Sequence, residues 1–303
     1  MRAGVAGAGH LGFHHARILR DLVDEVRIFD TDPGRTAEVR ESLGIAAEGS
    51  LEELLSWCDA LVVSCPTSTH HDVTMAALRA GRHALVEKPV ASEGSQAEEM
   101  AAAARSAGLV LAVGHVERFN PAVVAASRLL SKPLFVEGHR LAPFKPRGTD
   151  VSVVMDLMIH DIDLVLSFMT APVTGISASG VAVLTDKVDI ASARITFGDG
   201  AVANMTASRI SREPLRKLRF FQEKLYVSID FAARTVEAME VRGETILPLQ
   251  VAVEDVDPLT SELKDFLDCC RTGRKPVVGA EEGVRALKTA ELILSSMNLP
   301  GTA

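Results

Sequence analysis

AGVAGAGHLG, residues 3–12, is the stretch that decides the fold. Its apolar residues predict a strand over 3–6, and the apolar spacing that follows predicts a helix over 11–21. Between them stand Gly7, Gly9 and Gly12, spaced as GxGxxG. The motif alone is a weak signal, but a glycine-rich turn between a strand and a helix is what a dinucleotide-binding domain requires.

Each residue of this turn has an expected task in holding a dinucleotide. Gly7 permits the tight turn, Gly9 lets main-chain N–H groups approach a pyrophosphate, and Gly12 lets the helix pack closely on the strand. The helix predicted from Leu11, with His10 just before it, directs the positive end of its dipole toward the phosphates. The turn therefore predicts a cofactor site made of these five residues.

Asp30 ends the second predicted strand (26–29) and sets the expected choice of cofactor. A carboxylate there accepts hydrogen bonds from the adenosine ribose hydroxyls, and it would repel a 2′-phosphate. We therefore expect NAD rather than NADP. Arg35 is close by in the sequence and would soften this preference.

Strands and helices alternate along residues 1–120. Further strands are predicted at 60–65, 83–87 and 109–113, and helices at 35–43, 72–80 and 95–107, with a short one ending near Trp57. This alternation predicts a parallel sheet with right-handed crossovers. Residues 1–120 are therefore assigned to an α/β Rossmann domain with a doubly wound parallel sheet.

The pattern changes after Pro121. A helix (122–130) and a strand (134–140) are followed by a loop and a helix over 153–168. Five β-rich segments without long helices between them then predict a mainly antiparallel sheet: 191–197, 202–208, 218–221, 225–231 and 235–241. Two helices (259–270 and 280–297) close the chain. Residues 121–303 are assigned to an α+β domain for substrate binding and oligomerisation.

Glu87-Lys88-Pro89 follows the strand at 83–87. The carboxyl ends of parallel strands face the ligand crevice, so Lys88 is expected beside the nicotinamide, where its ammonium can hydrogen-bond the cofactor and a substrate hydroxyl. X–Pro bonds have an appreciable cis population, and a cis turn would direct the lysine into the crevice. A single lysine in a loop is by itself more often a surface residue.

Asp156, His160 and Asp163 are spaced i, i+4 and i+7, which on an α-helix places them on one face. His160 can take the hydroxyl proton as hydride leaves the carbon, and Asp156 can orient the imidazole or hold a neighbouring sugar hydroxyl. A surface Asp–His pair would be the plainer interpretation of this helix alone. With the glycine turn and Lys88 also present, we expect the ammonium and the imidazole to meet over one nicotinamide ring.

The composition excludes several classes of protein. The 303 residues are 47% hydrophobic and 24% charged, which is typical of a globular chain with a core. The net charge of −8 disfavours nucleic-acid binding. No apolar stretch approaches a membrane span and no secretion signal is visible, so a cytoplasmic protein is expected. No metal site is expected, and the four cysteines are expected to be reduced: Cys58, Cys65, Cys269 and Cys270.

Together these motifs resemble the Gfo/Idh/MocA family of dehydrogenases along essentially the whole chain. The resemblance is carried by GAGHLG (7–12), Asp30, PTSTHH (66–71), EKP (87–89), VGHVERFNP (113–121), and Asp156 with His160. It implies that Lys88, Asp156 and His160 form the catalytic group and that the Lys88–Pro89 bond is cis.

The same resemblance implies the rest of the cofactor site and the assembly. The remaining cofactor-binding residues are Pro66, Thr67, His70 and Glu87, beside Lys88 itself. The second sheet should be open and used for homodimer or homotetramer contacts, and the last helix (about 280–297) should pack back on the nucleotide domain.

A closer resemblance concerns the substrate. HRLAPF (139–144), the run 147–166 and TASRIS (206–211) are similar to bacterial dehydrogenases that oxidise the 3-hydroxyl of UDP-N-acetylglucosamine to a ketone, which is aminated on the way to lipid A. Cations would suit the diphosphate, although surface solubility explains single ones equally well. The predicted substrate-binding residues are Arg118, Asn120, Arg140, Arg147, Asp163 and Arg209.

Three alternatives stay open. A dehydrogenase of the same family that acts on a free polyol such as myo-inositol would need no cations for a diphosphate. A reductase of the biliverdin-reductase kind has less need of the full Lys–Asp–His group. A non-catalytic NAD-sensing regulator would bind the cofactor without turnover and could lose Lys88 or His160 at no cost.

Overall fold

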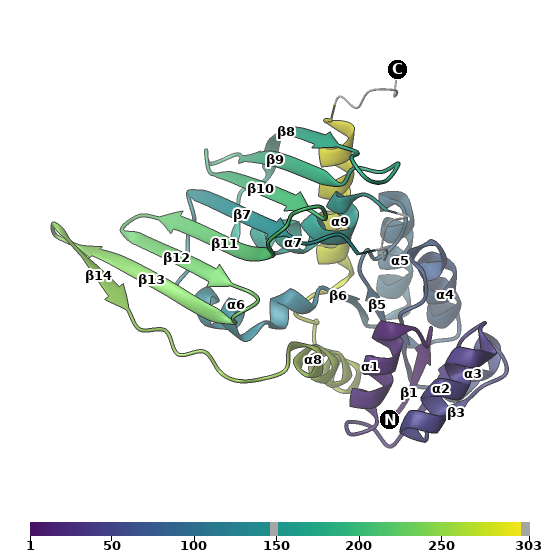
Figure 1. Ribbon diagram of the computed structural model, residues 1–303. Coiled ribbons are helices and arrows are strands. Elements are labelled where there is room, and N and C mark those ends of the chain that lie inside the picture. The colour runs from purple at the N-terminus through teal and green to yellow at the C-terminus, as the bar shows by residue number, and fades with distance from the viewer. Residues whose placement is uncertain (146–150, 298–303) are drawn as a thin grey trace. The chain divides into compact units, whose positions relative to one another are not determined.

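The computed structural model describes residues 1–145 and 151–297, which form two compact units (Figure 1). The first unit contains Met1–Val116 and Pro258–Arg285; the second contains Glu117–Asp257 and the described residues from Ala286 on. The segment Pro258–Arg285 thus lies outside the residues 1–120 assigned from the sequence. It joins the first unit because apolar side chains of its helix pack into that unit's core, and an amphipathic pattern does not reveal which core it will meet.

The first unit is built on a six-stranded parallel sheet in the order β3-β2-β1-β4-β5-β6. Its strands are β1 (Arg2–Ala6), β2 (Glu25–Phe29), β3 (Ala46–Ala47), β4 (Ala60–Val63), β5 (His83–Glu87) and β6 (Leu111–Gly114). Its helices are α1 (His10–Leu19), α2 (Pro33–Leu43), α3 (Leu51–Trp57), α4 (Thr67–Arg79), α5 (Gly94–Ala107) and α8 (Pro258–Thr272). The predicted Rossmann fold is confirmed.

The strand order reverses between β1 and β4, and this switch point is where doubly wound sheets bind ligands. Every residue of β4 is buried, as expected of a parallel strand covered on both faces. On one face, α1, α2 and α8 supply side chains to a single core cluster, among them Leu19, Val39 and Phe266. The sheet therefore fixes the glycine turn after β1 beside the chain that leaves β4.

The second unit is built on an open eight-stranded sheet in the order β14-β13-β12-β11-β7-β10-β9-β8. The strands are β7 (Phe135–Leu141), β8 (Val173–Val181), β9 (Ile190–Phe197), β10 (Val202–Ser208), β11 (Leu215–Gln222), β12 (Leu225–Asp230), β13 (Thr235–Arg242) and β14 (Thr245–Leu249). The pairing of β7 with β10 is parallel and the other pairings are antiparallel. The predicted open, mainly antiparallel sheet is confirmed.

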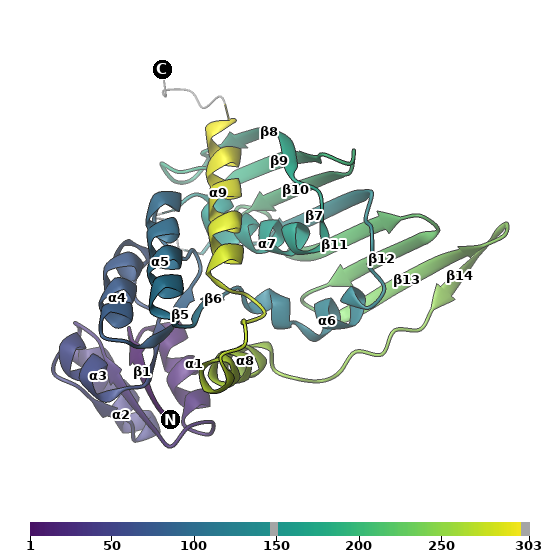
Figure 2. The ribbon, with the colours of Figure 1, turned by 180° about the vertical axis from the view of Figure 1, so that it is seen from behind.

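Helices lie on one face of this sheet, as the views from both sides show (Figures 1 and 2). They are α6 (Pro121–Ser127), α7 (Ile159–Phe168) and α9 (Ala280–Ser295), and their apolar residues share one core with the strands. The first residues of α9 belong to the first unit, and its residues from Ala286 on belong to the core of the second.

The sequence analysis missed the two edge strands of this sheet. The sequence of β8, VTGISASGV, is rich in Gly and Ser, which have little intrinsic preference for strands. The short β14 carries Pro248, a residue that is tolerated at an edge but normally argues against a strand. Pairing with β9 and β13, rather than local sequence, makes these segments strands.

The helix predicted over 153–168 is in fact two elements. A π-helical turn, η2 (Val154–Met158), precedes α7. Because a π-turn contains more residues per turn than an α-helix, the spacing of Asp156, His160 and Asp163 does not place them on one regular helical face. Their burial agrees: Asp156 and His160 are half-buried, whereas Asp163 is buried in the core side of α7.

Candidate active site

The glycine turn has the geometry that the sequence predicted. Gly7 has a φ of +96°, and a Cβ there would lie 2.5 Å from the amide nitrogen of Cys65. A Cβ on Gly12 would lie 1.8 Å from the carbonyl oxygen of Gly7, so this glycine is required for close packing. A Cβ on Gly9 would meet nothing nearer than 3.7 Å. Gly9 is therefore open to a ligand, while Gly7 and Gly12 are fixed by the protein.

The first turn of α1 is prepared for an anion. Gly9 is its N-cap residue and supplies no side chain, and the first turn, which begins at His10 and Leu11, contains no acidic residue. The free N–H groups of a helix N-terminus and the helix dipole favour a phosphate at such a position. Ser64, which the sequence analysis missed, braces the turn by donating from its hydroxyl to the Gly7 carbonyl at 2.9 Å.

Asp30 supports the same turn from the end of β2. Its Oδ2 accepts from the amide of Ala8 at 2.7 Å, and its Oδ1 accepts from the amide of Asp32 at 2.8 Å. The guanidinium of Arg35 lies 3.8 Å from Asp30 and 3.5 Å from Asp32. Asp30 thus fixes the glycine turn, and Arg35 is held by carboxylates at the adenosine end.

A pocket of about 340 Å³ opens beside this turn, and its lining fits a nucleotide. It is lined by Ala8, Gly9, His10, Phe13, Arg35 and Glu38. Main-chain amides, an aromatic ring and a guanidinium are the groups that contact phosphate and base in such sites. These residues would hold the adenosine and pyrophosphate of NAD.

The Lys88–Pro89 peptide bond is cis, as the resemblance implied. Lys88 leaves the carboxyl end of β5, and its main-chain N–H donates to the Glu87 carboxylate at 3.3 Å. The Glu87 side chain points into the first unit, where its Oε1 lies 2.7 Å from Nε2 of His15 and both side chains are buried. Glu87, expected to bind the cofactor, is therefore held by the protein, whereas Lys88 is half-buried.

The predicted cofactor-binding residues after β4 also differ in whether they are accessible or buried. Pro66 and Thr67 begin α4 beside the glycine turn and remain partly accessible. His70 is buried, with Nδ1 2.8 Å from the carbonyl oxygen of Pro89 and Nε2 2.9 Å from that of Cys65. Burial lowers the pKa of His70, and a neutral imidazole donates to one of these carbonyls at a time. His70 therefore fixes the Lys88 turn.

In the second unit, Asp156 lies in the π-turn η2 and His160 in the first turn of α7. Both residues are half-buried. π-Turns inside helices occur frequently at functional sites. The two residues predicted to be catalytic in this unit are thus adjacent along an irregular helix start.

Arg140, one of the predicted substrate cations, is the centre of a buried ion-pair network. Its Nη2 lies 2.7 Å from Asp161 Oδ1, its Nε lies 3.1 Å from both Asp161 oxygens, and its Nη1 lies 3.0 Å from Glu117 Oε1. Burial alone would lower the pKa of Arg140, but these two carboxylates outweigh it and raise the pKa. The guanidinium is therefore committed to the core of the second unit.

Two further predicted substrate residues lie in the same region. Arg118 Nη1 is 3.9 Å from Oδ2 of the buried Asp163, while the Arg118 side chain stays 17% exposed. Asn120 caps α6 by accepting from the amide of Ala122 at 3.1 Å, and it donates to Glu117 at 3.0 Å. Arg118 keeps access to a ligand, whereas Asn120 has a structural task.

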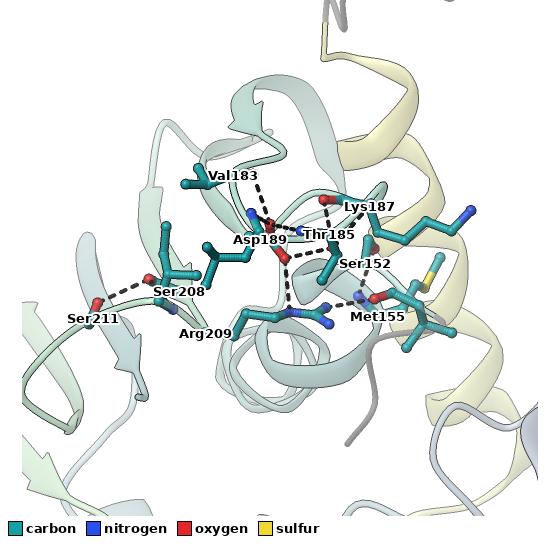
Figure 3. Close-up of polar contacts among 12 residues, drawn as sticks. Ser152, Met155, Val183, Thr185, Lys187, Asp189, Ser208, Arg209 and Ser211 are labelled. Carbon is teal, nitrogen blue, oxygen red and sulfur yellow. Dashed lines mark hydrogen bonds and ion pairs between the residues drawn. The ribbon is translucent and has the colours of Figure 1, made fainter. Parts of the chain in front are cut away.

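Arg209 joins two loops of the second unit (Figure 3). Its Nη2 donates to the Val151 carbonyl at 2.6 Å, and its Nε lies 3.8 Å from Asp189. Asp189 also accepts from three main-chain N–H groups, those of Val183, Leu184 and Thr185, at 2.7 to 2.9 Å. Arg209 therefore anchors the chain just before η2. Arg147, the remaining predicted cation, lies outside the described residues.

The sequence analysis missed the partners of these cations. Asp161 and Asp189 looked like ordinary acidic residues, and nothing in their local sequence indicates burial. Within the described residues, no cluster of three or more His, Cys, Asp or Glu side chains suits a metal ion, and the four cysteines are free.

The two units define an oxidoreductase with a dinucleotide-binding domain, and comparisons with known proteins agree. Residues 1–115 match the oxidoreductase family with an NAD-binding Rossmann fold, and residues 127–228 match the GFO/IDH/MocA C-terminal domain. UDP-N-acetylglucosamine 3-dehydrogenase of Acidithiobacillus ferrooxidans is 39% identical over 96% of this chain and 95% of its own. The chain belongs to the Gfo/Idh/MocA family of NAD-dependent dehydrogenases.

A second relative and two solved structures are also similar to this chain. The scyllo-inositol 2-dehydrogenase (NAD(+)) of Bacillus subtilis is 28% identical over 92% of this chain and 88% of its own. A solved structure of the Acidithiobacillus ferrooxidans enzyme superposes with a TM-score of 0.93 and 38% identity, covering 98% of this chain and 97% of that one. Levoglucosan dehydrogenase in complex with NADH superposes with a TM-score of 0.87 at 16% identity, covering 98% and 96%, and shows the shared fold. In the described residues, no helix is long and apolar enough to span a bilayer.

Proposed function

We propose that this protein oxidises the 3-hydroxyl of UDP-N-acetylglucosamine to a ketone, with NAD as the hydride acceptor. The observation that carries the proposal is the similarity, at 39% identity over nearly the full length of both chains, to an enzyme named for that reaction. The inositol dehydrogenase is less similar, at 28% identity. The nucleotide sugar is therefore preferred over a free polyol.

Lys88, Asp156 and His160 are the proposed catalytic residues. The Lys88 ammonium positions the substrate hydroxyl and makes its proton easier to remove. His160 accepts that proton, and Asp156 orients the imidazole or holds a neighbouring hydroxyl. NAD, when bound, supplies the hydride acceptor. Lys88, Asp156 and His160 are half-buried, whereas Glu87 and Asp163 beside them in the chain are buried, and this difference supports the assignment.

The proposed cofactor residues are those that the protein leaves open: Gly9, His10, Leu11, Pro66 and Thr67, with Asp30 at the adenosine ribose. Arg118 is the proposed cation for the substrate. Arg140 and Arg209 are left out of the substrate site, because each has a carboxylate and a structural task within its own unit.

We also propose an oligomeric state and a cellular location for this protein. An aromatic cluster on the sheet face opposite the helices supports pairing of copies through that face: Phe135 and Phe221 are 39% and 38% exposed, and the Phe221 ring centroid lies 5.2 Å from that of Tyr226. We propose a homodimer or homotetramer in the cytoplasm that feeds a diamino sugar branch of lipid A synthesis.

The test is turnover with purified protein, followed by NADH absorbance. The wild type is incubated with NAD and either UDP-N-acetylglucosamine or myo-inositol. Lys88→Ala should lower kcat by about 10²- to 10⁴-fold, because it removes a group that acts on the reacting hydroxyl. NAD affinity, measured by calorimetry, should change little, since the glycine turn is intact.

Lys132→Ala, at an exposed lysine, is the matched control and should keep wild-type turnover. Near-normal turnover of Lys88→Ala would refute the catalytic assignment. Turnover with myo-inositol but not with the nucleotide sugar would instead support the free-polyol dehydrogenase. Tight NAD binding without turnover on either alcohol would favour the NAD-sensing regulator.

A further inference from the structure

A buried polar cluster in the first unit has no place in the proposed reaction. It contains Glu87 from β5, His15 from α1 and Glu262 from α8, which are at most 7% exposed. Helices α1 and α8 pack against each other, and both contribute to the same core. Three ionisable side chains in an apolar core require an explanation, because burying a charge without a partner is costly.

Hydrogen bonds connect this cluster to Lys88. His15 Nε2 lies 2.7 Å from Glu87 Oε1, and Glu87 Oε2 accepts from the main-chain N–H of Lys88 at 3.3 Å. Gly114 lets this carboxylate sit under β6, since a Cβ there would lie 2.9 Å from Oε2. The Glu87 carboxylate is thus fixed on both sides and itself fixes the start of the Lys88 turn.

The charge of Glu87 determines the tautomer of His15. Burial opposes ionisation of Glu87, but the hydrogen bond from His15 and the nearby Lys88 outweigh it and lower the pKa of Glu87. An ionised Glu87 requires a proton on Nε2 of His15. In a neutral ring Nδ1 is then an acceptor. This Nδ1 is buried and has no hydrogen-bond partner among the described residues.

Glu262 also lacks hydrogen-bond partners. It is 2% exposed, and neither of its carboxyl oxygens has a hydrogen-bond partner among the described residues. Burial, and then the negative charges of Glu87 and Asp265, raise the pKa of Glu262 well above its ordinary range. A protonated carboxyl group offers one O–H donor, which is what the Nδ1 acceptor of His15 lacks.

We propose that Glu262, His15 and Glu87 form a polar relay, closed by one water between Glu262 and His15, that positions Lys88 for catalysis. All three are positioning residues, and the inference rests on the proposed role of Lys88. The charged or titratable groups around the relay are Lys88 at the end of β5, Asp265 on α8 and His70 on α4, whose own pKa is affected by Glu87.

The first test needs no activity. In the intact protein, infrared spectra at neutral pH should contain the carbonyl band of a buried protonated carboxyl group, which Glu262→Gln removes. Nitrogen NMR of the histidine rings should show His15 protonated on Nε2 and accepting on Nδ1. Absence of the infrared band, or a proton on Nδ1 of His15, would overturn the relay even if the enzyme worked as proposed.

The second test compares two replacements of similar size. Glu262→Met removes the donor and should lower kcat by about 10- to 100-fold, because small displacements of a catalytic group cost that much. NAD affinity should stay unchanged. Glu262→Gln, whose amide donates, should recover most of the lost turnover. Equal turnover of Glu262→Met and wild type, with only stability reduced, would show that the cluster is merely structural.

The proposed function fails separately from the relay. If the wild type oxidises neither alcohol, the catalytic role of Lys88 fails while the infrared and NMR results still stand. If Lys88→Ala is inactive but Glu262→Met and Glu87→Gln are fully active, the relay fails and the dehydrogenase assignment stands.

Discussion

Glu262 in the first unit and Asp189 in the second are both buried carboxyl groups, yet the protein treats them in opposite ways. Asp189 receives three main-chain N–H groups, the Thr185 hydroxyl at 2.8 Å and the nearby Arg209 guanidinium (Figure 3). Burial raises its pKa, but the three main-chain N–H groups and the Thr185 hydroxyl outweigh burial and lower the pKa to about 2. Glu262 has no such donors among the described residues, and its pKa rises.

The difference follows from the surrounding backbone. Asp189 is enclosed by a loop (183–185) whose three N–H groups converge on its carboxylate. Glu262 lies in the second turn of α8, and neither of its carboxyl oxygens receives a donor among the described residues. The pKa of Asp189 is therefore lowered because donors surround its carboxylate, and the pKa of Glu262 is raised because its buried oxygens have none among the described residues.

The largest effect that would test this comparison is expected from Asp189→Leu. It leaves three main-chain N–H groups and the Arg209 guanidinium without their carboxylate, and should lower the free energy of unfolding by about 3–5 kcal/mol. Urea unfolding of the intact protein measures this. Asp199→Asn, at an exposed turn, is the control and should change little. A loss for Asp189→Leu no greater than that of the control would mean that the loop network is not stabilising.

A smaller effect on the free energy of unfolding is expected when the pH is lowered. Because the folded pKa of Asp189 is depressed, its contribution is fully present above the ordinary Asp pKa of 3.8 and is lost as pH falls toward about 2. A shift of this size corresponds to roughly 2 kcal/mol. Unfolding free energies measured down this pH range should therefore decline more steeply for the wild type than for Asp189→Asn. Parallel curves would contradict the assignment.

The smallest effect, opposite in sign, is expected from Glu262→Gln. The folded pKa of Glu262 is raised, so the wild type loses stability as pH rises from the ordinary Glu pKa through the raised one. Glutamine has no charge to bury, and the variant should be more stable than the wild type by about 1 kcal/mol in mildly alkaline buffer. Thermal or urea unfolding across neutral and alkaline pH is the measurement. A variant whose pH dependence equals that of the wild type would show that Glu262 is not protonated.

Local motifs of this chain could be predicted from its sequence because their physics is local. The glycine turn, the Asp30 position and the Glu87-Lys88-Pro89 turn depend on residues a few positions apart, and the structure places each at a strand end as expected. The alternation of strands and helices likewise follows from short-range patterns. At Asp156 a π-turn interrupts the helix, and the α-helical spacing that we predicted there is wrong. The spacing of residues in the sequence does not indicate this turn.

The sequence alone determined the fold class, the NAD-binding turn and the residue types offered for catalysis. Only the tertiary structure decided which cations are committed internally: Arg140 to Asp161, 21 positions away, and Arg209 to the Val151 carbonyl, 58 positions away. It also decided which carboxyl groups keep their charge. The reason is that charge state and accessibility depend on what packs around a side chain, and those neighbours come from distant parts of the chain.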